Sequence, residues 1–238
     1  MQSIFQRLIR WLNRSAELTH PELRRLEFWK NLAKVPQNIP FGEARYVVVD
    51  VETSGLNLLE DKLISIGAVA VVNGRVVVGD SFSVVLQQAT VSQKENILLH
   101  GIGGAAQLEG VPAREALLEF LDYLGKSPLV AFHVTFDQTM IRRAMRQFLG
   151  FSFKHVWLDL AYIMPALNPV LAARYRSLDD WINHFEIRNE ARHNALADAL
   201  VTAQLFQVAM HQARNKNIPD LSGLRDLEKA QRWVSRVD

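Results

Sequence analysis

Five residues that span almost 150 positions constrain this chain more than any other feature of its sequence. Four are carboxylates, and the fifth is a histidine, the side chain best suited to move a proton near neutral pH. Two of the acids end a β-branched run in VVVDVETSGL, a third lies in AFHVTFD, and the histidine precedes the fourth by five positions in HNALADAL. A two-metal phosphodiester hydrolase with its own general base needs such a set of side chains. The five residues are Asp50, Glu52, Asp137, His193 and Asp198.

The composition predicts a soluble globular protein of a reducing compartment. With 238 residues, 49% of them apolar, the chain can bury one sizeable core. No stretch approaches the roughly 18 uninterrupted apolar residues that a membrane span needs. Cysteine is absent, which excludes disulfides and thiolate metal sites, and arginines interrupt the apolar positions of the first residues, unlike those of a signal peptide. We therefore expect a cytoplasmic protein that is not an integral membrane protein.

The net charge of +2 is unevenly distributed and suggests a division of the chain. Residues 1–44 carry seven Lys/Arg against four acids, whereas residues 45–238 carry 20 against 21. Apolar residues recur at helical spacing from Ile4 to Leu12, and a second helix is expected to start near Pro21. The following PQNIPFG stretch is typical of a linker. We predict a basic helical extension over residues 1–44, a main domain over 45–213, and a mixed-charge tail with one short helix over 214–238.

Three interpretations of the extension stay open at this point. Its apolar stripe could pack on the main domain, dock a protein partner, or lie along nucleic acid or an anionic membrane surface. Trp11 and Trp29 favour an interface of some kind.

The main domain opens with strands and continues with helices. Asn73-Gly74 between two β-branched runs is a strong hairpin signal. Residues 100–110 (HGIGGAAQLEG) are expected to form a flexible connection, since they lack the Lys-Ser/Thr ending of a P-loop. The pattern predicts an α/β fold with a mixed sheet of about five strands flanked by helices. The expected strands are 46–49, 63–72, 75–86 and 129–132, and the expected helices are 112–124, 138–149, 177–185 and 195–213.

The first carboxylate pair has the geometry of a metal site. Side chains alternate along a strand, so Asp50 and Glu52 at the end of the first strand point to the same side. Hard cations such as Mg²⁺ take oxygen ligands and keep waters and phosphate oxygens as the remainder, so a few carboxylates suffice. Asp137 and Asp198 could complete such a site from two helices.

The motifs DVETSGL, Phe136-Asp137 and HNALADA together resemble the three motifs of the DEDDh family of 3′-to-5′ exonucleases, which includes the proofreading epsilon subunit of bacterial DNA polymerase III. The resemblance covers roughly residues 45 to 212. It implies a ribonuclease H-like fold, His193 as the base that deprotonates the attacking water, and Thr53 and Leu56 near the terminal nucleotide. It also implies two Mg²⁺ or Mn²⁺ ions, held by Asp50, Glu52, Asp137 and Asp198.

One departure from the family pattern concerns the second motif. The family usually has His-Asn where this chain has Phe132 and His133, ahead of Phe136. His133 can still donate a hydrogen bond, so we expect altered substrate positioning more than lost activity. We expect His133 and Phe136, with Thr53 and Leu56, to be the substrate-binding residues. Asp159 aligns loosely with an acid of many relatives, and we assign it a capping or structural role.

The sequence therefore predicts a metal-dependent 3′-to-5′ exonuclease that releases nucleoside monophosphates from single-stranded or frayed ends, with DNA favoured over RNA. A first alternative is an exoribonuclease of the oligoribonuclease or RNA-trimming kind. The second alternative is a catalytically silent module that binds nucleic acid or a polymerase partner. All five catalytic positions are intact, which argues against the silent module.

Overall fold

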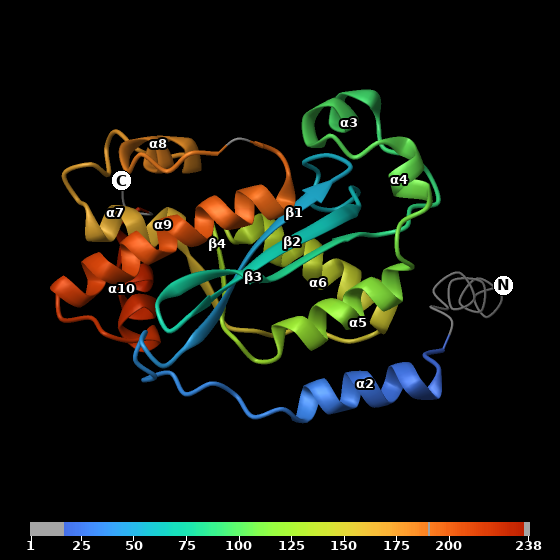
Figure 1. The fold of residues 1–238 in the computed structure, drawn as a ribbon, viewed down its shortest axis with the longest axis horizontal. Helices are drawn as coiled ribbons and strands as arrows, with labels where there is room; N and C mark the ends of the chain where they lie inside the picture. Colours follow the sequence, from blue (N-terminus) through green and yellow to red (C-terminus); the bar gives the residue numbers. More distant parts are fainter. Residues whose placement is uncertain (1–16, 190, 236–238) are drawn as a thin grey trace, which may run out of the picture.

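The computed structural model describes residues 17–189 and 191–235, and its centre is a five-stranded sheet (Figure 1). The strand order is β3-β2-β1-β4-β5, in which β1, β2 and β3 pair antiparallel while β4 and β5 run parallel to β1. The predicted α/β fold with a mixed sheet of about five strands is confirmed. The strands are β1 (Arg45–Thr53), β2 (Leu63–Val72), β3 (Arg75–Val85), β4 (Leu129–Ala131) and β5 (Trp157–Asp159).

Local sequence explains the first three strands. They are rich in valine and isoleucine, whose branched side chains suit a pleated surface. Asn73 and Gly74 both adopt positive φ angles, 52° and 76°, as the predicted tight hairpin between β2 and β3 requires. β1 and β2 are buried on both faces, whereas β3 forms the more exposed edge.

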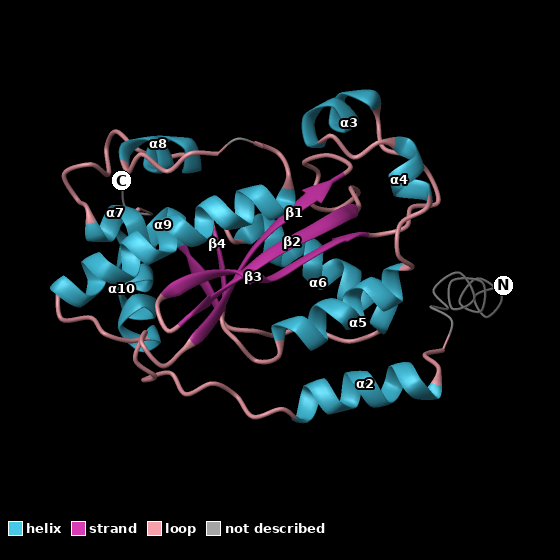
Figure 2. Cartoon of the chain, in the orientation of Figure 1, coloured by secondary structure: helices cyan, strands magenta, loops and turns pink. Residues whose placement is uncertain are grey.

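Helices cover both faces of the sheet, as Figure 2 shows. Because side chains alternate along β1, Val47 and Val49 pack into one core while Tyr46 and Val48 pack into the other. The first core is closed by α2 (His20–Asn31), α5 (Ala113–Leu124) and α6 (Thr135–Leu149). The second is closed by α7 (Leu160–Leu167), α8 (Leu178–His184), α9 (Ala195–Asn215) and α10 (Leu221–Val234).

The described part of the N-terminal segment packs on the main domain. Leu26 and Trp29 of α2 are buried in the first core, and the Trp29 indole nitrogen donates to the Gly125 carbonyl at 2.7 Å. Arg25 forms ion pairs with Glu115 and Asp122 of α5, both at 2.6 Å. The structure therefore shows α2 packed on the main domain. The helix predicted from Ile4 to Leu12, and Trp11 with it, lie outside the described residues.

The C-terminal residues, predicted to be a tail with one short helix, form a longer helix that packs on the second core. α10 has 14 residues, and its Leu221 and Leu224 are buried in the second core. The Phe41 amide donates to the Pro219 carbonyl at 3.0 Å, so the predicted linker contacts the segment that leads into α10. Burial of α10 against α7 explains the longer helix, because it depends on contacts that are distant along the chain.

Two other segments differ from the sequence prediction. Residues 100–110, expected to be a flexible connection, contain the end of α3 (Lys94–His100) and all of α4 (Gly104–Leu108), separated by Gly101 at φ 70°. β5 and α7 were not predicted, because β5 has three residues and α7 contains Pro165, which reads as a helix breaker. Among the described residues, no helix is both long enough and apolar enough to cross a membrane.

Candidate active site

The end of β1 delivers the first two carboxylates to one side of the strand. Asp50 and Glu52 are separated by Val51, and they pair across the ladder with Gly67 and Ser65 of β2. Their position follows from the alternation of side chains along a strand, as predicted. Both side chains are half-buried at the edge where α6 and α9 begin.

Gly67 lets the third carboxylate reach this pair. A Cβ atom on Gly67 would lie 2.2 Å from the backbone carbon of Ala195, which no side chain tolerates. The first turn of α9 therefore packs directly on the backbone of β2, opposite Asp50. Asp198 lies in that first turn. Sequence reasoning missed Gly67, although a glycine inside a strand is a known signal of close backbone approach.

The structure brings Asp50, Glu52 and Asp198 together. One carboxylate oxygen from each lies within 4.8 Å of the others, a spacing that suits a shared divalent cation. Asp137 lies in the first turn of α6 and is buried at 4% exposure, but it is not part of this closest group. Its charge still acts on Asp50, since it contributes to the raised pKa of that residue.

The pKa values of these acids show the cost of holding them together without a cation. Burial, followed by the charges of Asp137, Asp198 and Glu52, raises the pKa of Asp50 well above its usual range. Burial and then Asp198 raise the pKa of Glu52 to about 8. Burial is also the main reason why the pKa of Asp137 rises to about 8. A divalent cation would remove this penalty, so the residues fit a metal centre.

Arg192 is a member of the site that sequence reasoning missed. Its Nη1 donates to Asp198 Oδ1 at 2.7 Å, and its Nε lies 2.9 Å from Asp179 of α8. Asn189 Nδ2 donates to the same Asp198 oxygen at 2.6 Å. The arginine therefore supplies positive charge to the acidic cluster and lowers the pKa values of Asp50 and Glu52 against the effect of burial. Its position beside His193 was a usable signal.

His193 lies on the loop that enters α9. Its backbone adopts a positive φ of 62°, and its amide donates to Asp198 Oδ2 at 2.9 Å. Asn194 then caps the helix, with its side chain accepting from the Ala197 amide. The imidazole is half-buried, and the described part of the chain holds no hydrogen-bond partner for it. The backbone of His193 and the carboxylate of Asp198 are thus directly hydrogen-bonded.

The four residues expected near the substrate lie in different surroundings. Thr53 is buried, and its hydroxyl donates to the Gly55 carbonyl at 2.6 Å, which shapes the turn after β1. Leu56 projects from this turn with 84% of its surface exposed. Phe136 is half-buried against the first core, whereas His133 is exposed and adopts a positive φ of 64°. Only Leu56 and His133 are therefore freely presented to a ligand.

Asp159 has the structural role that the sequence predicted. Its Oδ1 accepts from the amides of Ala161 and His133, at 3.1 and 3.0 Å, so it caps α7 and holds the unusual backbone at His133. Its Oδ2 pairs with Arg232 of α10 at 2.8 Å. The C-terminal helix thereby connects to the loop that leads into α6.

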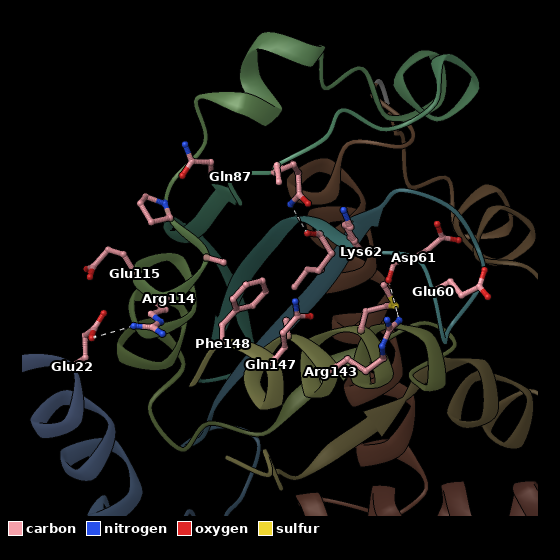
Figure 3. Close-up of a pocket in the computed structure, with 17 residues that line it drawn as sticks. Glu22, Glu60, Asp61, Lys62, Gln87, Arg114, Glu115, Arg143, Gln147 and Phe148 are labelled. Carbon is pink, nitrogen blue, oxygen red and sulfur yellow. Dashed lines mark hydrogen bonds and ion pairs between the residues drawn. The ribbon is translucent and has the colours of Figure 1, made fainter. Parts of the chain in front are cut away.

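A cavity of about 760 Å³ lies away from the carboxylates, between α2, α5, α6 and the turn after β1 (Figure 3). Arg143 reaches across it and donates to the carbonyls of Leu58 and Asp61, at 2.5 and 2.9 Å. This contact holds the turn that carries Leu56 against α6. None of the four candidate metal ligands lines the cavity.

Comparison with known proteins agrees with this geometry. The family model described as exonuclease matches residues 47–206, from β1 to α9. The chain belongs to this exonuclease family. All five predicted catalytic positions lie within the matched residues, and the predicted relationship is confirmed.

Relatives of this exonuclease include bacterial proteins named DNA polymerase III. It is 29% identical over 188 residues to the PolC-type DNA polymerase III of Thermotoga maritima, covering 79% of this chain and 13% of the relative. It is 27% identical over 202 residues to the DNA polymerase III subunit epsilon of Buchnera aphidicola, covering 81% and 82%. The chain thus spans only a small part of the PolC-type relatives.

Solved structures share the fold of this exonuclease. E. coli exonuclease I in complex with a dT13 oligonucleotide has a TM-score of 0.61 at 17% identity, over 73% of this chain and 42% of that one. Exonuclease X in complex with 5′-overhanging duplex DNA has a TM-score of 0.60 at 18% identity, over 77% and 99%. The expected ribonuclease H-like exonuclease fold is confirmed.

Proposed function

We propose that the protein is a metal-dependent 3′-to-5′ exonuclease that hydrolyses phosphodiester bonds at the 3′ end of single-stranded or frayed nucleic acid, with DNA favoured, and releases nucleoside monophosphates. The observation that carries the proposal is the convergence of Asp50, Glu52 and Asp198 at the end of β1, within 4.8 Å of one another. Membership of the exonuclease family supports the reaction class.

Two divalent ions, Mg²⁺ or Mn²⁺, are part of the proposal. Asp50, Glu52 and Asp198 would hold them, with Asp137 completing the set from α6. Bound ions supply charge neutralisation at the phosphate and stabilise the attacking and departing oxygens of an in-line displacement. The four acids alone repel a phosphodiester, so substrate affinity as well as turnover should depend on metal.

His193 is the proposed general base. A neutral imidazole nitrogen can accept the proton of the attacking water, which is the task of a general base. The amide of His193 is bound to Asp198, so the base and a metal ligand keep a constant relation through the backbone. The absence of a described partner for the imidazole leaves the ring free to approach the substrate.

Leu56 and His133 are proposed to position the terminal nucleotide, with Thr53 and Phe136 shaping the surface behind them. Leu56 offers an apolar contact to a base, and His133 offers a hydrogen-bond donor where the family has asparagine. A preference for DNA is supported by the relatives, which are named as DNA polymerase III or its subunit epsilon, and by fold neighbours solved in complex with DNA.

The wider setting is also proposed. We infer a proofreading or repair role in the cytoplasm, with a protein partner docking through the helical segment of residues 1–44, the exonuclease domain over 45–213 and the tail over 214–238. The epsilon relative, whose length this chain covers at 82%, supports a subunit of this kind.

The test compares end-labelled DNA and RNA of one sequence, incubated with the purified protein and Mg²⁺, Mn²⁺ or EDTA. Metal-dependent shortening from the 3′ end, absent in the Asp198→Ala protein, is the expected result. Faster shortening of RNA would replace the DNA exonuclease with the exoribonuclease. Absence of shortening under every condition would leave a nucleic-acid-binding module.

A further inference from the structure

Helix α6 carries a basic stripe along its exposed face. Thr135, Thr139, Arg142 and Arg146 recur at intervals of four, three and four residues, which places them on one side of a helix. Arg142 and Arg146 are exposed, whereas Asp137 and Met140 on the other side are buried. We call Thr135, Thr139, Arg142 and Arg146 the α6 stripe.

The arginines of the α6 stripe have no acidic partner in the part of the chain that the structure describes. Residues 138–158 contain three arginines and one lysine and no aspartate or glutamate. Within residues 17–189 and 191–235, neither Arg142 nor Arg146 forms an ion pair, whereas Arg25, Arg45, Arg192 and Arg232 all pair with carboxylates. Arg146 lies in the last turn of α6, where its positive charge interacts favourably with the helix dipole. Arg142 lies about one turn earlier, so the dipole does not explain its position.

The stripe borders a groove of about 520 Å³. Arg142, Arg143 and Arg146 line it together with Thr139 and residues 150–153. Phe151 supplies an aromatic surface there, and Lys30 of α2 lies 5.4 Å from the centre of the Phe151 ring. Phe151 is half-buried against the first core, so the groove offers mainly positive charge, which in proteins that bind single-stranded nucleic acid follows the phosphate backbone.

The stripe starts at the N-terminal end of α6, the helix that also carries Asp137, and lies on the side of the helix opposite to the buried Asp137. α6 starts two residues before Asp137, next to the exposed His133, and Figure 1 shows it on one face of the sheet beside α5. A helix rises about 1.5 Å per residue, so the distance from Thr135 to Arg146 is about 16 Å along its axis. A stacked strand carries one phosphate every ~3.4 Å, so this length corresponds to about five phosphates.

We infer that the α6 stripe binds the backbone phosphates of the single strand whose 3′ end lies in the active site. The inference rests on the proposed function for the identity of that strand. Charge complementarity carries it, because arginines without an ion pair, in a groove whose lining holds no acid, match a polyanion. The groove is lined by the C-terminal half of α6, the helix whose first turn carries Asp137. The arginines add affinity for longer strands and leave the chemistry at the end unchanged.

The test measures binding in the Asp198→Ala background, so that no substrate is consumed. Fluorescence anisotropy follows a labelled oligothymidylate of about 20 nucleotides, with Mg²⁺ present, over a series of salt concentrations. The variant is Arg142→Ala with Arg146→Ala. The matched control is Arg75→Ala with Lys216→Ala, which removes the same charge from exposed positions at the β2–β3 hairpin and the end of α9.

The salt dependence distinguishes a phosphate contact from a general charge effect. For single strands, a plot of the logarithm of the binding constant against the logarithm of the salt concentration has a slope of about −0.7 per neutralised phosphate. Because the α6 variant loses two arginines, its slope should be shallower by about 1.4. The control should keep the original slope. Binding of a thymidine dinucleotide, too short to reach Arg142, should be equal in all proteins.

An unchanged slope in the α6 variant would overturn the inference, provided that its melting temperature matches that of the parent. An equal change in the control would overturn it as well, and so would an acidic peptide that competes as well as the oligonucleotide. The nuclease assay is read separately. If the parent protein hydrolyses DNA but the salt slope of the α6 variant is unchanged, the proposed function is supported and the role of the stripe is excluded. If the slope becomes shallower but the parent protein does not hydrolyse DNA, the stripe binds nucleic acid on a catalytically silent protein.

Discussion

Two buried aspartates in this fold accept hydrogen bonds from arginines, yet their surroundings differ. Asp198 pairs with Arg192 at 2.7 Å and Asp159 with Arg232 at 2.8 Å, and the aspartates are 3% and 1% exposed. Both aspartates also accept from backbone amides at the start of a helix or loop. Judged only by their arginine partners and backbone hydrogen bonds, the two aspartates would be assigned the same role.

The neighbouring charges separate them. Asp198 lies within 4.8 Å of Asp50 and Glu52, so one arginine faces a group of acids that repel one another. Asp159 uses its oxygens to cap α7 and to hold the backbone at His133. Backbone donors satisfy both aspartates, so the difference lies in the neighbouring acids. Asp198 shares its space with Asp50 and Glu52 as a candidate metal ligand, whereas Asp159 links α7, the His133 backbone and Arg232.

The largest expected effect is loss of activity in Asp198→Ala. Removing this carboxylate should bring hydrolysis of labelled DNA below detection, because the closest acidic group loses a member. The fold should persist, since repulsion within the cluster falls and Arg192 keeps Asp179 at 2.9 Å. Circular dichroism and a thermal melt provide the control. If the variant is folded and still hydrolyses DNA at a near-normal rate, Asp198 is not a metal ligand.

Next in size is the effect of His193→Ala. Loss of a general base typically lowers turnover by about 10²- to 10⁴-fold, so a decrease in this range is expected at saturating substrate. Divalent metal affinity, measured by titration calorimetry, should change little because the residue is not a ligand in this proposal. An unchanged rate would remove His193 from the mechanism.

Asp159→Ala should act on stability first. It removes the cap of α7, the acceptor for the His133 amide and the partner of Arg232, which together should lower the free energy of unfolding by about 2–4 kcal/mol. Urea denaturation in EDTA measures this change. Equal losses of stability in Asp159→Ala and Asp198→Ala would erase the distinction between the two aspartates.

The last prediction is a pH dependence of the stability of the metal-free protein. Glu52 and Asp137 have pKa values raised to about 8, so the folded state keeps protons that the unfolded chain loses above its ordinary pKa near 4. Their stabilising contribution is complete below that pKa and is lost as the pH rises toward 8. The melting temperature in EDTA should therefore fall between pH 5 and 8, an interval set by these pKa values.

Glu52→Gln provides the matched test, because it removes one titrating group and keeps the side-chain shape. The decline in melting temperature should become shallower in this variant, and Mg²⁺ should raise the melting temperature of the parent most at high pH. A decline of the same steepness in both proteins would show that Glu52 does not carry the effect.

Much of the fold and site could be predicted from the sequence. Alternation along β1 predicted that Asp50 and Glu52 share a side, and Asn73-Gly74 predicted the hairpin that the structure contains. These predictions succeed because they depend on residues that are near in sequence, where backbone geometry alone decides the outcome. The prediction for residues 100–110 was wrong, because α3 ends there and α4 lies within them. Gln107 of α4 is hydrogen-bonded to Gln88 and Ser92, contacts that the glycine-rich pattern does not reveal.

The sequence by itself therefore determined the chemical inventory, the family and the order of the main elements. Only the tertiary structure decided that Gly67 admits α9, that Arg192 faces the acids, and that α10 supplies Arg232 to Asp159. It also decided that Arg142 and Arg146 lie on a face without acids. The physical reason is that burial, ion pairing and pKa depend on which atoms meet in space, and these contacts join residues that lie far apart along the chain.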